Sequence, residues 1–171
     1  TEVIDDMCEQ GEVDLVEALS QPFPLLVICD MMGIPRSEFD TVLRATNVIL
    51  GGGDAEMMGL PGDTVDPGAL MGAFFNAGVE LIGLMNELAE FRRKNPTDDL
   101  TSALVHNDRG EDMLTPEEIG PFFILLAVAG NDTTRTALSH GMHLLSQNPD
   151  QRKIWQDDLD GITPTAVDEI V

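Results

Sequence analysis

A helical pattern of roughly 30 residues, with no stop signal inside it, limits most strongly how this chain can fold. The pattern begins at Thr115, which is followed by a proline and, three residues on, by Glu118, as in a capping box at a helix start. No firm stop signal follows before Asn148-Pro149. Such a helix spans roughly 45–50 Å, whereas three or four turns are usual in globular domains. We therefore expect one long central helix.

The remainder of the chain also follows helical patterns, so the predicted fold class is all-α. Ser37 and Asp98 are the expected N-caps of two further helices. Gly, Pro and Asp residues predict a loop over 51–68 and a turn or small hairpin over 108–114. Besides the long helix, the predicted helices are residues 13–20, 24–32, 38–50, 69–94, 99–107, 149–158 and 163–171.

Charge and apolar content exclude several kinds of partner. The 171 residues include 9 Lys+Arg and 31 Asp+Glu, and the net charge of −22 argues against nucleic acids and anionic membranes. The longest strongly apolar run, residues 121–130, is too short to span a bilayer. The two cysteines, Cys8 and Cys29, make no disulfide framework, and no signal peptide is visible, so we expect a cytoplasmic protein.

The long helix has a weak point in the sequence LLAVAGNDTTRTAL, residues 125–138. Glycine costs about 1 kcal/mol against alanine in a helix interior, and threonine is a weak helix former. Ala129 and Gly130 form a notch of small residues that lets a flat or bulky neighbour approach the backbone. The Thr133 hydroxyl can bond back to the carbonyl four residues earlier, and Asp132 projects roughly 100° around the axis.

Two interpretations of this segment remain open from the residues alone. In the first, Ala129-Gly130 marks a crossing of two helices, and Thr133 is bonded to its own helix. In the second, the small residues, the acid and the hydroxyl form a binding or catalytic site. Short motifs have high false-positive rates, but the notch, the acid-threonine pair, the long helix and the apolar lead-in together are more specific than any one of them.

The sequence AGNDTTR in a long central helix resembles the distal oxygen-binding helix of cytochrome P450 monooxygenases. Other segments resemble the same family in the same order, among them PLLVICDMMGIP, DDLTSALV, NPDQR and DLDGITPTAVDEIV. The resemblance is to bacterial members that hydroxylate methyl-branched lipids and sterol side chains at a terminal methyl group. Those members commonly have Glu where this chain has Asp132, although aspartate is frequent in the wider family.

The resemblance implies catalytic and cofactor-binding roles in this helix. Ala129 and Gly130 are expected to lie against haem and oxygen. Thr133 is expected to hydrogen-bond the bound oxygen or its water, and Asp132 to relay protons from solvent. These two residues are the predicted catalytic pair.

The resemblance also implies where the substrate binds. Leu125 and Val128 are expected to line an apolar pocket together with Ala129. The loop over residues 51–68 and its flanking helices correspond to the family's mobile lid over the substrate channel.

The resemblance further implies a haem-thiolate enzyme whose cysteine ligand lies outside this sequence. Glu169 is the first residue of the family's Glu-x-x-Arg motif, and the chain ends before its arginine. Neither Cys8 nor Cys29 has the glycine-rich surroundings of the ligand loop. Because the chain also starts at Thr1, we expect residues 1–171 to be a single partial P450 domain. It would lack the N-terminal part and the haem-thiolate C-terminal part, and be inactive alone.

The implied partners are an apolar lipid or sterol substrate, dioxygen, and a ferredoxin with its NAD(P)H-dependent reductase, without nucleic acid or a membrane span. His140 and His143 lie three residues apart, but no third ligand is near, so no metal site is predicted.

The alternative hypothesis is a non-catalytic acidic helical binding or scaffold domain. An arginine directly after Val171 and a downstream cysteine loop would favour the enzyme. A natural stop codon directly after Val171 would favour the scaffold.

Overall fold

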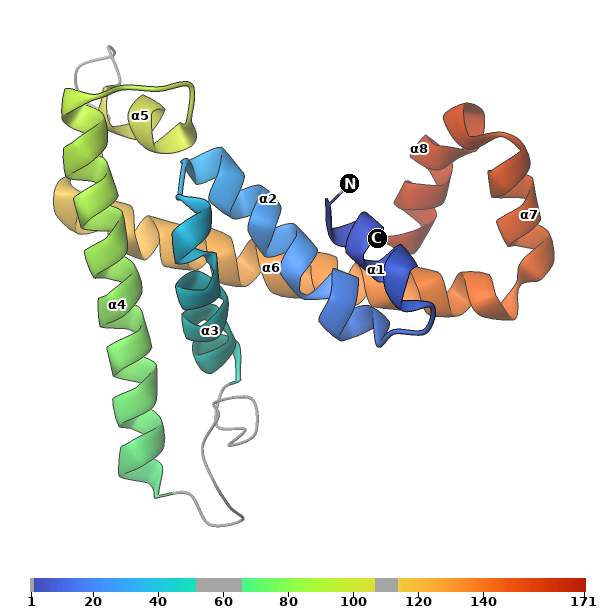
Figure 1. Cartoon of the computed structure of the whole chain (residues 1–171), viewed down its shortest axis with the longest axis horizontal. Helices are drawn as coiled ribbons and strands as arrows, with labels where there is room; N and C mark the ends of the chain where they lie inside the picture. Colours follow the sequence, from blue (N-terminus) through green and yellow to red (C-terminus); the bar gives the residue numbers. More distant parts are fainter. Residues whose placement is uncertain (1, 52–65, 107–113) are drawn as a thin grey trace. The chain divides into compact units, whose positions relative to one another are not determined.

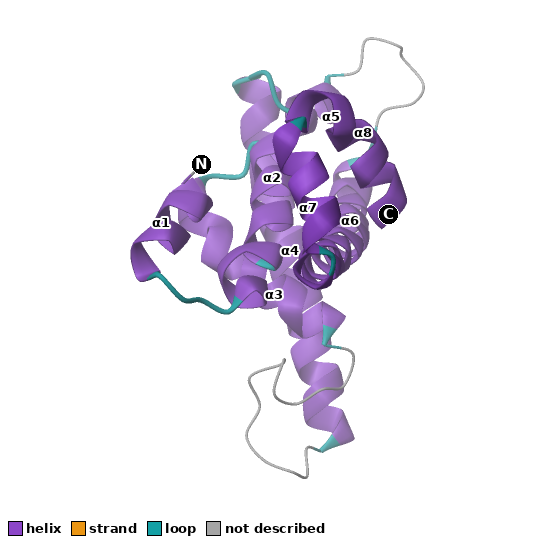
Figure 2. Ribbon diagram, turned by 90° about the vertical axis from the view of Figure 1, so that its right-hand side faces the viewer, coloured by secondary structure: helices purple, strands orange, loops and turns teal. Residues whose placement is uncertain are grey.

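Every described element of the chain is helical, which confirms the predicted all-α class (Figures 1 and 2). The computed structural model describes residues 2–51, 66–106 and 114–171. The elements are α1 (Glu2–Gln10), a π-helical turn η1 (Val16–Ser20), α2 (Pro22–Met32), a 3-10 turn η2 (Arg36–Glu38), α3 (Phe39–Leu50), α4 (Pro67–Lys94), α5 (Leu100–Val105), α6 (Pro116–Gln147), α7 (Pro149–Asp157) and α8 (Leu159–Ile170).

The helices divide into two compact units. The larger unit comprises Leu25–Asn131, and the smaller one comprises Thr1–Pro24 together with Asp132–Val171. The boundary falls within α6, the predicted long helix, which has 32 residues. Its start is as predicted, because the backbone N–H of Thr115 donates to Glu118 Oε2 at 2.9 Å, which is one half of a capping box.

The core of the larger unit is built from α2, α3, α4 and the first half of α6. Helices α3 and α4 lie side by side (Figure 1), and an ion pair of 2.7 Å joins Arg44 to Glu80 across them. Helix α6 crosses α4 at Gly120, where an added Cβ atom would lie only 2.9 Å from Ile82 Cα. The largest fully buried side chains of this core are Leu25, Met32, Val42, Leu81, Met85, Ile119 and Phe123.

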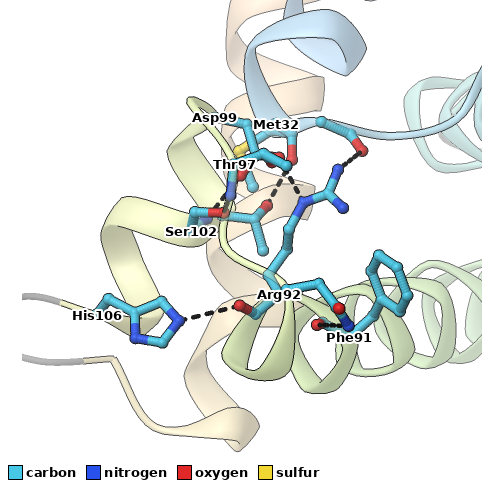
Figure 3. Close-up of polar contacts among 10 residues, drawn as sticks. Met32, Phe91, Arg92, Thr97, Asp99, Ser102 and His106 are labelled. Atoms are coloured by element: carbon cyan, nitrogen blue, oxygen red, sulfur yellow. Dashed lines mark hydrogen bonds and ion pairs between the residues drawn. The ribbon is translucent and has the colours of Figure 1, made fainter.

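A polar cluster joins the ends of α2, α4 and α5 (Figure 3). Arg92 donates from Nε to Asp99 Oδ2 at 2.5 Å and from Nη2 to the Gly33 carbonyl at 3.0 Å. Asp99 also accepts from the backbone N–H of Ser102 at 2.7 Å and from the Thr97 hydroxyl at 2.6 Å. Burial by itself raises the pKa of Asp99, but these hydrogen bonds outweigh it and hold that pKa below its ordinary 3.8. The charged carboxylate therefore ties three helix ends together.

The structure corrects two predicted N-caps. Ser37 lies inside the turn η2, its hydroxyl bonds to the Glu38 carboxylate at 3.5 Å, and α3 begins only after Glu38. The cap of α5 is Asp99 and not Asp98, because the Asp99 carboxylate accepts the Ser102 N–H. The polar cluster holds Asp99 in that place, whereas Asp98 is exposed.

The N-terminal region differs from its prediction, and the predicted loops are mostly not described. Helix α1 is not among the predicted helices, although Val3, Ile4, Met7 and Cys8 of its sequence EVIDDMCEQ recur at helical spacing. The helix predicted over 13–20 is a short π-helical turn, and its five residues begin at Val16. The loop and turn predicted over 51–68 and 108–114 lie almost wholly outside the described residues.

In the smaller unit, α7 and α8 pack against each other and against the second half of α6. Trp155 Nε1 on α7 donates to Thr163 Oγ1 on α8 at 2.8 Å. Gly141 of α6 lies against Ile170 of α8, and a Cβ atom added to this glycine would be 3.2 Å from Ile170 Cδ1. These contacts fix where α8 lies along α6.

Helix α8 begins four residues before its predicted start at Thr163. Asp158 caps it, because its carboxylate accepts from the Gly161 N–H at 3.0 Å. Pro164 therefore lies inside the helix and not next to its start.

Helix α4 contains a longer, though less strongly apolar, stretch than the run at residues 121–130 on which the prediction of no membrane span rests. Its length and composition would let it cross a membrane, with a mean hydropathy of 1.5 over the best window, although core helices pass the same test. Part of α4 is core, since Ala77, Leu81, Met85, Leu88 and Ala89 are buried. Four apolar side chains of its first half are exposed, namely Met71, Phe74, Phe75 and Val79.

Candidate active site on helix α6

The predicted site residues of α6 lie along an exposed face of the helix. Ala129, Asp132 and Thr133 are exposed, and Val128 beside them is half-buried. Leu125 is 66% exposed, although leucine is usually a buried residue. Positions 125, 129 and 133 follow one another at intervals of four residues, so they share a helical face, and Asp132, three residues after Ala129, lies on the adjoining face. Together these two faces offer an apolar side chain, a small one, a carboxylate and a hydroxyl.

The opposite face of the first half of α6 is buried in the larger unit. Ile119, Phe123, Ala127 and Asn131 have no exposed surface. The Asn131 amide finds no hydrogen-bond partner among the described residues. This burial anchors the helix on one side and leaves the other side accessible.

Gly130 belongs to the contact between α6 and α2. A Cβ atom at Gly130 would lie 3.1 Å from Ile28 Cδ1, closer than the contact of about 3.5–4.0 Å that two carbon atoms prefer. The helix-crossing interpretation therefore accounts for Gly130. Ala129 lies on the exposed face, so it is the small residue that could belong to a binding or catalytic site. The expected place of Gly130 against a cofactor remains a prediction.

Glu169 lies on α8 in the smaller unit and is exposed. It borders a hollow of about 570 Å³. Apolar side chains make up most of the wall, among them Leu145, Ile154, Trp155 and Ile170. The predicted motif residue is therefore accessible at the edge of an apolar hollow.

Comparison with known protein families identifies the family of this chain. The sequence model described as "Cytochrome P450" matches residues 2–168. The chain belongs to the cytochrome P450 family.

Two curated relatives show which members of the family this P450 resembles. It is 46% identical over 160 residues to the methyl-branched lipid omega-hydroxylase of Mycobacterium tuberculosis strain H37Rv, a match that covers 94% of this chain and 35% of that protein. It is 38% identical to the steroid C26-monooxygenase of Mycolicibacterium smegmatis, covering 95% of this chain and 34% of that protein. The chain thus spans about a third of the length of these relatives.

Solved structures agree with the family assignment. A Mycobacterium marinum cytochrome P450 in complex with pseudoionone is 34% identical, with a TM-score of 0.84 over 99% of this chain and 39% of that one. A Bacillus megaterium P450 in complex with testosterone is 25% identical, with a TM-score of 0.82. The observed helices are therefore those of a P450 fold segment.

Haem is the cofactor that membership of the P450 family implies, and the exposed face of α6 fits one side of such a group. A flat macrocycle needs small residues where it approaches a backbone, and Ala129 supplies one. It also needs apolar surroundings, and the exposed Leu125 supplies an apolar side chain whose exposure is otherwise unusual. Thr133 adds a hydroxyl on the same face.

Neither cysteine of this chain fits the thiolate that would hold the haem of a P450. Cys29 is buried, and burial first, with the charge of Asp30 second, raises the pKa of its thiol to about 12. It therefore stays a neutral thiol, whereas the ligand is a thiolate. Cys8 is exposed on the acidic helix α1. Over the described residues, no group of three or more His, Cys, Asp or Glu could hold a metal ion.

Two contacts between helices lie beyond what the sequence pattern reveals. Ile28 touches the position of Gly130 from α2, but in the sequence it is one apolar residue of an apolar run. The Arg92–Asp99 pair joins separate helices and has no local spacing that marks it. His143 Nε2 lies 2.9 Å from Gln147 Nε2 and, like His140, is exposed, so the histidine pair belongs to the surface.

Proposed function

We propose that the protein is a haem-thiolate monooxygenase that hydroxylates a terminal methyl group of a methyl-branched lipid or a sterol side chain. The observation that supports it most is the exposed Asp132-Thr133 pair beside Ala129 on α6, in a chain of this family. Residues 1–171 are then the central part of a single P450 domain. A stand-alone acidic scaffold, the alternative hypothesis, gives no reason for this pair to lie on a P450 helix.

The chemistry divides between the cofactor and this chain. Haem with a thiolate ligand, when bound, supplies the cleavage of dioxygen and the insertion of one oxygen atom into a C–H bond. The chain's part is to deliver protons to that reaction. The Thr133 hydroxyl holds a proton at Oγ1 on the exposed face of α6, and the exposed Asp132 carboxylate can take up a proton from water and resupply it.

The proposed substrate class follows from the apolar residues of the same helix. Leu125, Val128 and Ala129 offer apolar surface, and their side chains cannot hold a polar group. A long branched hydrocarbon would then enter end-first, with its polar group held far from the site. Positioning can contribute several kcal/mol, enough to favour the terminal methyl over a tertiary C–H bond, which is weaker. Met57, Met58 and Leu60, expected in the lid, lie outside the described residues.

The proposed electron supply is a ferredoxin reduced by an NAD(P)H-dependent reductase, as the resemblance implies. A cytoplasmic location is part of the same proposal. It is supported by the two cysteines, Cys8 and Cys29, which are both free.

The test of the catalytic proposal is Thr133→Ala in the full-length enzyme, with Thr134→Ala as the matched control. Thr134 is also exposed, but it borders an apolar hollow with Ala137 and Leu138. We expect Thr133→Ala to keep consuming reduced nucleotide while it releases more peroxide and less product, by roughly 10²-fold, since general acid–base catalysis contributes about that much or more. The control should behave as wild type. An equal effect of both variants would contradict a proton-delivering role.

The test of the substrate proposal is product mapping by mass spectrometry. The full-length enzyme is offered methyl-branched fatty acids, isoprenoids and cholestenone. We expect oxidation mainly at a terminal methyl group. Mainly internal or tertiary hydroxylation, or turnover of small polar aromatics alone, would refute the substrate class and leave the monooxygenase proposal standing.

A further inference from the structure

Ile28 of α2 packs against α6 at Gly130, two and three residues before the proposed catalytic pair. Ile28 of α2 is only 8% exposed. Its Cδ1 atom lies 3.1 Å and its Cγ1 atom 4.0 Å from where a Cβ atom of residue 130 would be. A Cβ atom at position 130 would therefore lie a few tenths of an ångström too close to the terminal methyl of Ile28. Both residues belong to the larger unit, Leu25–Asn131.

This contact lies next to the proposed catalytic residues along α6. Residue 130 follows Ala129 directly and precedes Asp132 and Thr133 by two and three positions on one continuous helix. Ala127 and Asn131, on either side of residue 130, are fully buried, so this stretch is held on its inner face. A displacement of the backbone at residue 130 is passed to the neighbouring turn, because the helical hydrogen-bond ladder joins them.

We propose that Ile28 is a positioning residue for the reaction. Its Cδ1 methyl sets how deeply α6 sits at Gly130, and thereby where Ala129, Asp132 and Thr133 present their side chains. Ile28 itself touches neither the substrate nor the cofactor. The inference rests on the proposed function, because it names the residue that holds the proton-delivering pair in place.

The experiment moves one methyl group across this contact in the full-length enzyme. Ile28→Val deletes Cδ1, Gly130→Ala adds a methyl 3.1 Å from the position of Cδ1, and the double variant does both, so that the local volume is nearly conserved. We measure product formed per reduced nucleotide consumed. A misplacement of 1 Å can cost about 10²-fold, and the overlap here is smaller. We therefore expect a loss of about tenfold for Gly130→Ala, about threefold for Ile28→Val, and recovery to within about twofold in the double variant.

A second readout and a control separate positioning from general stability. The melting temperatures of the four proteins report the steric contact without any turnover, and we expect the two single shifts not to add in the double variant. Gly141→Ala is the matched control, since its new methyl would also meet an isoleucine of another helix, Ile170, at 3.2 Å. It lies 11 positions further along α6, and we expect it to shift the melting temperature and leave product per nucleotide unchanged.

Each result supports or overturns the proposal. Recovery in the double variant, with non-additive melting temperatures and a silent Gly141→Ala, supports it. A loss in Gly130→Ala that Ile28→Val does not relieve overturns it, since residue 130 then acts directly on what binds there. Non-additive melting with no change in product per nucleotide also overturns it, because the contact is then only structural. If the wild-type enzyme forms no product, the proposed function and this role are overturned together. The wild type is therefore measured before any variant is compared with it.

Discussion

The crossing of α6 and α4 at Gly120 leads to predictions of opposite sign for two glycine-to-alanine substitutions. Gly120 of α6 lies against α4, where a new Cβ atom would be 2.9 Å from both Cα and Cγ1 of Ile82. At Gly83, the residue after Ile82 in α4, an added Cβ atom would meet no atom within 4 Å among the described residues outside its own turn of helix. Both glycines are helical, so alanine brings the same intrinsic gain of about 1 kcal/mol at each.

The two positions differ in what the methyl group meets. At Gly120 the neighbour is a backbone atom, which cannot rotate away as a side chain can. Restoring a carbon contact of about 3.5–4.0 Å requires α4 and α6 to separate by about 0.6–1.1 Å. Overpacking of this kind costs about 1–3 kcal/mol, and a backbone collision belongs at the upper end. After the helical gain, Gly120→Ala should destabilise the protein by about 1–2 kcal/mol, whereas Gly83→Ala should stabilise it by about 0.5–1 kcal/mol.

The assay is thermal unfolding of the full-length protein, with helical circular dichroism as the signal. For chains of a few hundred residues, 1 kcal/mol shifts the melting temperature by about 2–4 °C or less. We expect Gly120→Ala to melt below wild type and Gly83→Ala above it. A melting temperature of Gly120→Ala at or above that of wild type would refute the close approach of α6 to α4.

Three further predictions test the polar cluster, the thiols and the core. Because the pKa of Asp99 is lowered on folding, its charge stabilises the fold above pH 3.8 and less as the pH falls through the lowered pKa. Asp99→Asn should therefore lose less stability than wild type in acid unfolding curves, and parallel curves would contradict this. Burial and a pKa of about 12 should leave Cys29 unlabelled by iodoacetamide under native conditions while Cys8 is labelled, as peptide mass spectrometry would detect. Phe123→Ala should cost about 3–5 kcal/mol of unfolding free energy, since this side chain is fully buried, and a loss below 1 kcal/mol in denaturant unfolding would contradict the core.

The sequence by itself determines the features that depend on neighbouring residues. The long helix begins at Pro116 and ends at Gln147 as predicted, because the Thr115–Glu118 capping pair and the Asn148-Pro149 stop are local signals. The all-α class follows in the same way, from apolar periodicity within each segment. The motif AGNDTTR also lies within a few residues of one helix, so its resemblance to P450 sequences needs no tertiary contact.

Tertiary structure decides the features that join distant residues. Asp98 and Asp99 are equally good caps by residue type, and Arg92 at the end of α4 favours Asp99 by pairing with it. Likewise, Ala129 and Gly130 are both merely small in the sequence. Only the packing of α2 separates them, since Ile28 comes from about a hundred residues away to fill the space at Gly130 and leaves Ala129 exposed. Contacts of this kind depend on where whole helices cross, and no pattern of neighbouring residues encodes that.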